Sequence, residues 1–258
     1  GAWTKSLIDN AARPSGALIY SGGEEMTPEQ REEIREDLER GVVVGGELRD
    51  LTILFSDIAG FTTLSERLPP AQLVTVINRF LEGQTERIID HGGYLDKYIG
   101  DAVMAVFGAP EPLDDHALAA CRAALACRAA LAELNDAIER EHGLRLGMRT
   151  GVNTGEVVVG NVGSTRKRNY TVLGDAVNLG SRLEGITKQY GADIIIGEGT
   201  KERISGFVCR EIDRVRVKGK DEAVAIFQPL GLEGQVEKPK LDEMKLWNQA
   251  LKLYRSQN

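Results

Sequence analysis

The stretch Tyr94-Leu-Asp-Lys-Tyr-Ile-Gly-Asp-Ala-Val-Met-Ala-Val-Phe107 carries the clearest fold signal in the chain. Two runs of apolar, aromatic and β-branched residues flank the dipeptide Gly100-Asp101, and such runs around a two-residue turn are typical of a β-hairpin. The pattern predicts strands over residues 94–99 and 102–107, with Asp101 at the tip of the hairpin.

A further strand is predicted before this hairpin. The run Leu51-Thr-Ile-Leu-Phe55 is apolar and partly β-branched, and it ends abruptly at Ser56-Asp57, as a buried strand does. Between this strand and the hairpin, apolar residues recur at helical spacing and predict a helix over residues 68–89. Asp57 is therefore expected at the end of a buried strand.

The rest of the chain alternates between helical and strand-like patterns. Helices are predicted over residues 115–141 and 175–190. Strands are predicted over residues 144–152, 155–162, 193–196, 207–212 and 223–230. The order β-α-β-β-α-β followed by further αβ units predicts an α+β fold with a ferredoxin-like, split βαβ core and extra αβ units.

The predicted folded domain spans residues 50–231 and is flanked by segments of a different character. Residues 1–26 show no sustained period and are expected to be a linker or disordered arm. Residues 27–49 are expected to form a connector or stalk, with a mostly charged helix from Thr27 to about Arg40. Residues 232–258 are expected to form a linker and an amphipathic helix, which either packs back on the domain or begins a further helical region.

The composition limits the classes of function. The 258 residues include 32 Lys and Arg against 39 Asp and Glu, and the resulting net charge of −7 argues against a partner nucleic acid. No apolar run reaches the roughly 18 residues of a transmembrane helix, so no membrane contact is expected of this chain. The three cysteines lack CxxC spacing and are expected to be reduced thiols. We expect a cytoplasmic location, within a parent protein that could itself be membrane-anchored.

Asp57 and Asp101 are candidate metal ligands. If the first strand pairs with the hairpin, the two carboxylates meet at one end of the sheet, and such a pair suits Mg²⁺, which also takes oxygens from substrate phosphates. The turn Ile58-Ala-Gly-Phe-Thr-Thr-Leu-Ser65 leads into a helix, so its free backbone N–H groups, with Phe61 and Thr62, are candidates to bind a phosphate. Taken alone, each aspartate could instead be an ordinary turn or cap residue.

A second polar cluster is predicted on the helix over residues 175–190. Asn178 and Arg182 are four residues apart and project from the same helix face, where an amide and a guanidinium could hold a phosphate. The alternative is a solvated polar face. Lys218-Gly-Lys220 is a further cationic turn, which could also be a solvated surface feature.

Together these segments resemble the catalytic domain of the class III nucleotidyl cyclases. Four stretches carry the resemblance, in this order along the chain: Leu54-Phe-Ser-Asp-Ile-Ala-Gly-Phe-Thr-Thr63, Lys97-Tyr-Ile-Gly-Asp-Ala-Val-Met-Ala-Val-Phe-Gly108, Tyr170 to Glu184, and Val217-Lys-Gly-Lys220. The resemblance extends over roughly residues 51–230 and is of the adenylyl, bacterial-like type. It implies a ferredoxin-like catalytic core that acts as a head-to-tail homodimer, with active sites shared between the subunits.

The resemblance also implies roles for individual residues. Asp57 and Asp101 match two metal-binding aspartates, and the carbonyl of Ile58 matches a minor metal ligand, for two Mg²⁺ or Mn²⁺ ions per site. The substrate-binding matches are Lys97 and Thr171 for the purine, Asn178 and Arg182 for the ribose and the transition state, Lys218 for the terminal phosphates and, in a loosely aligned loop, Arg166 for a phosphate.

The purine pair favours adenine on physical grounds. The Lys97 ammonium is a donor that suits the unprotonated N1 of adenine, and the Thr171 hydroxyl can accept from the N6 amino group. Guanine offers N1–H and O6 instead, and guanylyl members generally carry an acidic residue where Lys97 stands. Thr171 departs from the Asp that some members carry, and because a hydroxyl can donate as well as accept, discrimination is expected to rest mainly on Lys97.

The implied function is that of an adenylate cyclase, which converts ATP to 3′,5′-cyclic AMP and pyrophosphate as the output domain of a signalling protein. The 3′-oxygen would attack the α-phosphorus in line, with catalysis by positioning and charge neutralisation. The alternatives are a guanylyl cyclase and a catalytically silent nucleotide-binding dimerisation module. The run Gly22-Gly-Glu-Glu-Met26 superficially resembles the signature of diguanylate cyclases, but it lies ahead of the predicted domain and no apolar strand follows it.

Overall fold

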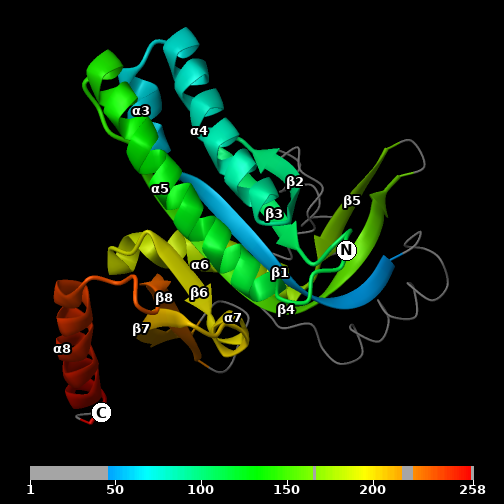
Figure 1. Ribbon diagram of the computed structural model, residues 1–258. Coiled ribbons are helices and arrows are strands. Elements are labelled where there is room, and N and C mark those ends of the chain that lie inside the picture. Colours follow the sequence, from blue (N-terminus) through cyan, green and yellow to red (C-terminus); the bar gives the residue numbers. More distant parts are fainter. Residues whose placement is uncertain (1–45, 165–166, 217–222, 257–258) are drawn as a thin grey trace.

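The computed structural model describes residues 46–164, 167–216 and 223–256 (Figure 1). Eight strands form one sheet in the order β2-β3-β1-β4-β6-β8-β7, and β5 pairs with β4 outside this path. The strands are β1 (Gly46–Ala59), β2 (Gly93–Ile99), β3 (Ala102–Phe107), β4 (Gly147–Gly163), β5 (Arg168–Leu173), β6 (Ile194–Gly197), β7 (Phe207–Val215) and β8 (Val224–Leu232). The helices are α3 (Phe61–Arg67), α4 (Pro70–Asp90), α5 (His116–His142), α6 (Asp175–Tyr190), α7 (Glu198–Arg203) and α8 (Lys238–Arg255).

The first four strands form the predicted ferredoxin-like core. β3 pairs antiparallel with both β1 and β2, so β1 and β2 run in the same direction with β3 between them. β4 pairs antiparallel with the other edge of β1. This is the split βαβ arrangement, and the predicted hairpin over residues 94–107 is β2 and β3. The α+β prediction is confirmed.

Helices cover both faces of the sheet, and alternate side chains of β1 pack against each layer. Leu54 belongs to the core under α4 and α5, which lie side by side over one face (Figure 1). The Phe55 ring, on the opposite side of the strand, lies against α6 at Gly180. Residues 51–56 of β1 are therefore all buried, with Thr52 and Ser56 among mostly apolar side chains, because both sides of the strand are covered.

β4 differs from its prediction. The two expected strands over residues 144–152 and 155–162 form one continuous strand, because Asn153 and Thr154 stay in the ladder opposite Ile53 and Thr52. The polar pair interrupts the apolar pattern without breaking the backbone pairing. β1 is also longer than predicted: it begins at Gly46, so residues 46–49 belong to the sheet.

α6 lies unusually close to β4 at Gly151. A Cβ atom at this position would come within 2.3 Å of the Gly180 carbonyl oxygen and of the Glu184 backbone nitrogen. Real Cβ atoms do not approach a backbone so closely, so only glycine allows the helix to lie at this distance. The glycine fixes the depth of α6 and, with it, the position of the predicted polar cluster.

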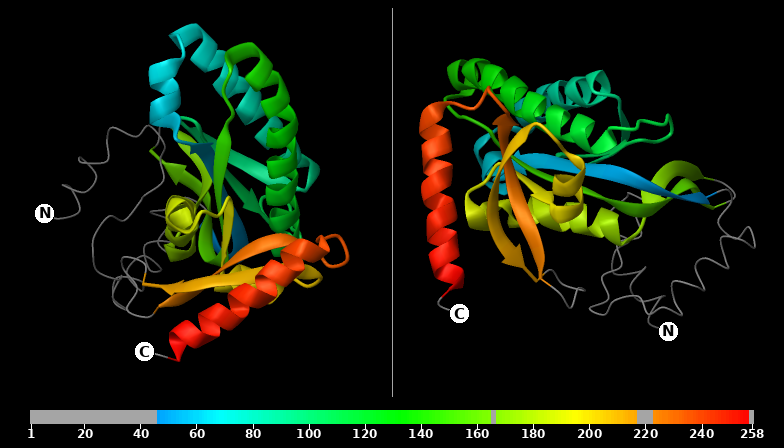
Figure 2. Two further views of the ribbon diagram at one scale, coloured as in Figure 1. Left: turned by 90° about the vertical axis from the view of Figure 1, so that its left-hand side faces the viewer. Right: turned by 60° about the horizontal axis from the view of Figure 1, so that its bottom comes forward.

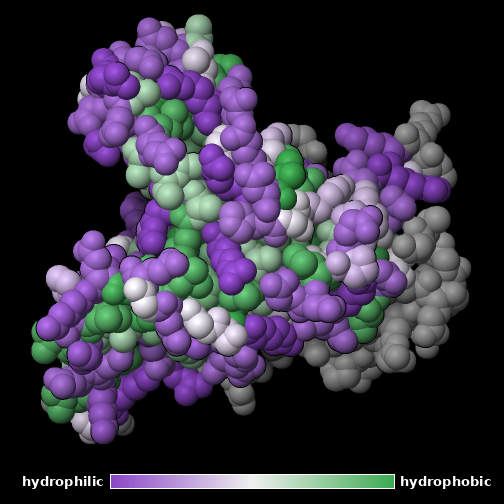
Figure 3. Space-filling model, in the orientation of Figure 1, coloured by the Kyte–Doolittle hydropathy of each residue, from purple (hydrophilic) through white to green (hydrophobic). Residues whose placement is uncertain are grey.

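The C-terminal helix α8 runs beside the edge strand β7 (Figure 2, right). The Trp247 indole donates to the Glu211 carbonyl at 2.6 Å, and the Arg210 guanidinium lies 4.8 Å above the Trp247 ring. No residue of α8 is buried. Leu246, Leu253 and Tyr254 are each more than 60% exposed, and hydrophobic atoms gather along this helix at the lower left of Figure 3. α8 therefore contacts the domain narrowly, and the two alternatives that the sequence left open for this helix stay predictions.

The remaining sequence predictions concern the N-terminal residues, the cysteines and the absence of a membrane-spanning helix. The arm over residues 1–26, the helix from Thr27 to Arg40 and the run from Gly22 to Met26 lie outside the described residues. The three cysteines are free thiols, as predicted. None of the described helices is both long and apolar enough to cross a membrane.

Candidate functional site

Two aspartates meet at one end of the sheet, as the sequence predicts. Asp57 lies near the end of β1, and Asp101 follows Gly100 in the β2–β3 turn. Because β1 pairs with β3, with Ser56 opposite Val103, the turn brings Asp101 to the end of β1. The Ile58 amide N–H donates to Asp101 Oδ2 at 3.3 Å. The two carboxylates and the Ile58 backbone therefore form one site within a single chain.

Arg149 completes this cluster and was missed by sequence reasoning. It lies directly opposite Asp57 in the β1–β4 ladder and donates to both Asp57 oxygens, from Nε at 3.0 Å and from Nη2 at 2.6 Å. Its Nε is also 3.2 Å from Glu184 Oε1 on α6. The missing signal is the strand register, which a single sequence does not contain. Glu184 is the last residue of the stretch Tyr170 to Glu184 that carries the family resemblance, but the sequence analysis assigned it no role.

The electrostatics of the cluster favour a cation. Burial raises the pKa of Asp101, and the nearby charge of Asp57 raises it further. Burial raises the pKa of Glu184 to about 7, again with a contribution from Asp57, while Arg149 opposes the shift. Three carboxyl groups thus face one guanidinium, an arrangement that a divalent cation would stabilise.

The donor set fits the predicted metal. Asp57, Asp101 and the Ile58 carbonyl supply oxygen atoms, which are the ligands that Mg²⁺ prefers, and Mg²⁺ sites in phosphate-binding enzymes use one or two carboxylates with substrate oxygens. Within the described ranges, no group of three or more His, Cys, Asp and Glu side chains has the arrangement of a metal site.

The predicted purine pair is also assembled within one chain. Lys97 Nζ on β2 donates to Thr171 Oγ1 on β5 at 3.1 Å. The contact forms because β5 folds across the sheet face opposite α4 and α5, where Val172 is buried with Met104 and Val106 of β3. Beside it, the rings of Tyr94 and Tyr170 meet edge to face, with centroids 5.8 Å apart.

Asp96, which the sequence analysis did not single out, contacts both members of the predicted purine pair. Thr171 Oγ1 donates to Asp96 Oδ2 at 2.5 Å, and Lys97 Nζ lies 3.4 Å from Asp96 Oδ1. Consecutive residues of a regular strand point to opposite faces, but the register of β2 against β3 shifts between Leu95 and Lys97. This β-bulge allows Asp96 and Lys97 to contact the same threonine. Burial raises the pKa of Asp96, while Thr171 and Lys97 lower it.

Of the other predicted residues, the structure describes Asn178, Arg182, Phe61 and Thr62, and none of these four forms a hydrogen bond or ion pair with the aspartates or with the purine pair. Asn178 and Arg182 are one turn apart on α6, both half-buried, on the helix that also carries Glu184. Phe61 begins α3 and packs on the core, and Thr62 beside it is exposed. Arg166 and Lys218 lie outside the described residues.

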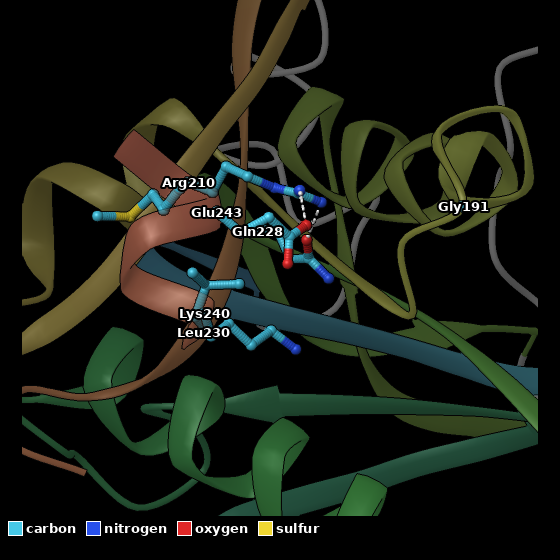
Figure 4. Close-up of a pocket in the computed structure, with 7 residues that line it drawn as sticks. Gly191, Arg210, Gln228, Leu230, Lys240 and Glu243 are labelled. Carbon is cyan, nitrogen blue, oxygen red and sulfur yellow. Dashed lines mark hydrogen bonds and ion pairs between the residues drawn. The ribbon is translucent and has the colours of Figure 1, made fainter. Parts of the chain in front are cut away.

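A pocket elsewhere contains none of the predicted site residues. It has a volume of about 200 Å³ and lies between α8 and the strands β7 and β8. Figure 4 shows the Arg210 guanidinium pointing toward Gln228 and Glu243, which it contacts at 2.6 Å and 3.3 Å. This pocket therefore belongs to the contact of α8 with the domain.

Comparison with known proteins gives a family match over most of the chain. Residues 43–228 match a family model described as the adenylate and guanylate cyclase catalytic domain. A protein from Anabaena cylindrica named adenylate cyclase is 42% identical over 188 residues, which are 70% of this chain and 36% of that protein. The chain thus spans little more than a third of the length of this relative.

Solved structures of both nucleotide types resemble the chain. The adenylyl cyclase CyaB from P. aeruginosa is 32% identical with a TM-score of 0.69, over 75% of this chain and 100% of that one. The guanylyl cyclase Cya2 is 37% identical with a TM-score of 0.67, over 74% of this chain and 97% of that one. Since the two scores are nearly equal, the base preference must be argued from side chains.

Proposed function

This chain belongs to the adenylate and guanylate cyclase catalytic domain family, and from that membership we propose that it converts ATP to 3′,5′-cyclic AMP and pyrophosphate. The single observation that carries the choice of ATP is the contact between Lys97 and Thr171. The pair presents an ammonium donor beside a hydroxyl oxygen. Adenine offers the complementary edge, with an acceptor at N1 and a donor at N6.

We assign the metal site to Asp57, Asp101 and the Ile58 carbonyl, for two Mg²⁺ or Mn²⁺ ions. Bound there, the metals would lower the pKa of the ATP 3′-hydroxyl and neutralise charge on the phosphates. The carboxylates of the chain set where that charge is neutralised, because both are fixed at the end of one rigid sheet. Asp57 must also exchange its contacts with Arg149 for contacts with metal, and Glu184 offers Arg149 a second carboxylate within reach.

The substrate is proposed to lie between two copies of the chain in a head-to-tail homodimer. Asp57 and Asp101 of one subunit would face the purine pair of the other, so each of two sites would draw on both chains. Asn178 would orient the ribose, and Arg182 would stabilise charge on the transferring phosphoryl group. Arg166, Lys218, Phe61 and Thr62 are proposed to contact phosphates.

We propose that this domain is the cytoplasmic output part of a longer signalling protein. Its family relatives include a protein almost three times the length of the matched segment. The regulatory input would then lie outside the catalytic domain, and the domain would report it as a change in the rate of cyclic nucleotide production.

The test is product formation from ATP and from GTP, each with Mg²⁺ and with Mn²⁺. Cyclic AMP should be the main product, and an Asp57→Ala variant should lose at least about a hundredfold in kcat, as expected when a group that neutralises transition-state charge is removed. Cyclic GMP as the main product would contradict the choice of ATP. A folded dimer that makes neither product would indicate a silent nucleotide-binding module.

A further inference from the structure

We infer that Asp96 is a specificity-determining positioning residue, which makes Thr171 an acceptor toward the purine by taking the proton of its hydroxyl group. Asp96 would not itself touch the base. The inference rests on the proposed use of a purine nucleotide at Lys97 and Thr171, and it removes the ambiguity that a free hydroxyl would leave in the choice between adenine and guanine.

The geometry commits the hydroxyl proton to Asp96. The side chain of Asp96 is 1% exposed and Thr171 is 2% exposed, so water does not compete for this hydrogen bond. Thr171 Oγ1 donates to Asp96 Oδ2 at 2.5 Å. A carboxylate can only accept, and the Lys97 ammonium 3.4 Å from Asp96 Oδ1 favours the charged form.

Counting donors and acceptors shows what remains for a ligand. A threonine hydroxyl has one proton and two lone pairs. The proton goes to Asp96, and one lone pair accepts from Lys97 at 3.1 Å, so one lone pair is left. The ammonium has three protons; one goes to Thr171, and Asp96 Oδ1 at 3.4 Å attracts the ammonium as an ion pair without accepting a hydrogen bond, so a proton is left for a ligand. The three residues together therefore offer one donor and one acceptor, side by side.

This arrangement discriminates between the purines at two atoms. Adenine places its N6 donor against the Thr171 lone pair and its N1 acceptor against the Lys97 proton. Guanine and hypoxanthine place O6 against the lone pair and N1–H against the ammonium, so both contacts become repulsive. Without Asp96, the hydroxyl could rotate and donate to O6, which would relieve one of the two conflicts.

The bonding state of Asp96 fits a role beyond stability. Asp96 Oδ1 is buried and accepts no hydrogen bond from any described residue, and the Lys97 ammonium lies 3.4 Å away from it as an ion pair. A buried carboxylate with one unsatisfied oxygen is a costly way to fill space, and a buried polar group that is only partly satisfied calls for another explanation. The bulge in β2 turns this side chain toward Thr171, where its one hydrogen bond sets the direction of the hydroxyl proton.

The sharpest variant is Asp96→Asn, because it keeps the shape and removes the charge. The Lys97 ammonium attracts the amide oxygen, which leaves the amide NH₂ group facing Thr171 as a donor. The hydroxyl proton is then free to point at the base. Inosine triphosphate is the best probe, since it differs from ATP only in carrying O6 and N1–H and lacks the extra amino group of GTP.

We expect the ratio of kcat/KM for inosine triphosphate to kcat/KM for ATP to rise roughly tenfold in Asp96→Asn. Thr171→Val, which has no hydroxyl, supplies the decisive control. On the native background it removes a repulsive lone pair, so the ratio should rise. On the Asp96→Asn background it removes a useful donor, so the ratio should fall. A change of the same sign on both backgrounds, or an unchanged ratio in Asp96→Asn, would overturn the inference.

Two further measurements keep the test decisive. Dissociation constants of 3′-deoxy-ATP and 3′-deoxyinosine triphosphate, which cannot cyclise, give the same ratio without turnover. If Asp96→Asn does not fold, Thr171→Val alone tests the inference. A rise in the ratio supports a Thr171 hydroxyl proton that is held by Asp96, and a fall in the ratio contradicts it. A wild-type protein that prefers GTP to ATP contradicts the proposed function. A wild-type preference for ATP that Asp96→Asn leaves unchanged contradicts only the role of Asp96.

Discussion

Arg149 and Asp57 lie directly opposite each other on β4 and β1, and the guanidinium donates to both oxygens of the carboxylate. A planar, two-point contact of this kind is among the stronger charge-assisted pairs, and here both side chains are mostly buried. The residue proposed to bind metal is therefore already bound by a cation that belongs to the chain.

Replacing Arg149 by Met should strengthen metal binding to the nucleotide-free protein. Loss of the competing guanidinium should lower the dissociation constant of Mn²⁺ by roughly tenfold, because a hydrogen bond to a charged group is worth about 1.5–3 kcal/mol. Mn²⁺ titration followed by electron paramagnetic resonance measures this directly. Arg145→Met is the matched control, since it removes the same charge from an exposed pair with Glu139. Weaker Mn²⁺ binding in Arg149→Met would mean that Arg149 orients Asp57.

Shared active sites predict recovery of activity when two inactive variants are mixed. Asp57→Ala and Lys97→Ala damage opposite halves of each site, so a mixed dimer has one intact site and one site with both defects. Random pairing makes half of the dimers mixed, and activity should return to about a quarter of the wild-type value. Lys97→Ala mixed with an Asp57→Ala/Lys97→Ala double variant is the control, and it should show no recovery. If the first mixture stays inactive although subunit exchange has been demonstrated, active sites shared between the subunits are excluded.

The close approach of α6 to β4 predicts opposite effects for two glycine substitutions. Gly151→Ala should lower the free energy of unfolding by about 3 kcal/mol or prevent folding, because the new Cβ would lie 2.3 Å from backbone atoms of α6. Gly185→Ala, within α6 and open to solvent at that position, should raise it by about 0.5–1 kcal/mol. Urea unfolding at equal protein concentration compares the two. Similar values for both variants would mean that the helix can move away from the sheet.

The burial of His116 predicts that the protein loses stability in mild acid. It begins α5, and its Nδ1 lies 2.7 Å from the hydroxyl of the buried Thr52. Burial lowers the pKa of His116 below the usual value of about 6.5, so between these two values the unfolded chain binds more protons. The free energy of unfolding should therefore fall as pH falls through 6.5 toward the lowered pKa, by at most about 1.4 kcal/mol per pH unit from this one group.

The corresponding variant is His116→Gln, which keeps a polar group beside Thr52 but does not titrate. Urea unfolding at pH 7.5 and 5.5 should show a smaller decline for this variant than for the wild type. Equal declines would assign the acid sensitivity to other groups.

Local features of the fold were predictable from the sequence, and features that depend on register were not. The β2–β3 hairpin follows from its turn residues and apolar runs, which act over a few residues. The pairing of Arg149 with Asp57 depends on how β1 and β4 align, and nothing near either residue encodes that alignment. Asp96 was overlooked for a related reason, because strict alternation along β2 would point it away from Lys97, and only the bulge reverses this.

The sequence predicts two strands where the structure has the single strand β4, and this difference also depends on contacts with distant parts of the chain. Asn153 and Thr154 look like a turn between apolar runs, yet both side chains are buried and bonded. Asn153 donates to the Ala176 carbonyl of α6 at 2.9 Å, and Thr154 contacts Thr52 at 2.8 Å. Polar residues that find partners across the layers are compatible with a buried strand, and those partners come from distant parts of the sequence.

The glycine contact between β4 and α6 also limits how the proposed cyclase can be regulated. A helix that touches a strand backbone to backbone has no layer of side chains on which to slide, and side chains are what allow packed elements to shear past each other. Asn178, Arg182 and Glu184 must then travel with β1 and β4 as one rigid body. In the proposed homodimer, a regulatory signal would therefore change the rate by rotating whole subunits against each other. A crosslink across that dimer would fix the activity, whereas a crosslink between α6 and β4 would leave it unchanged.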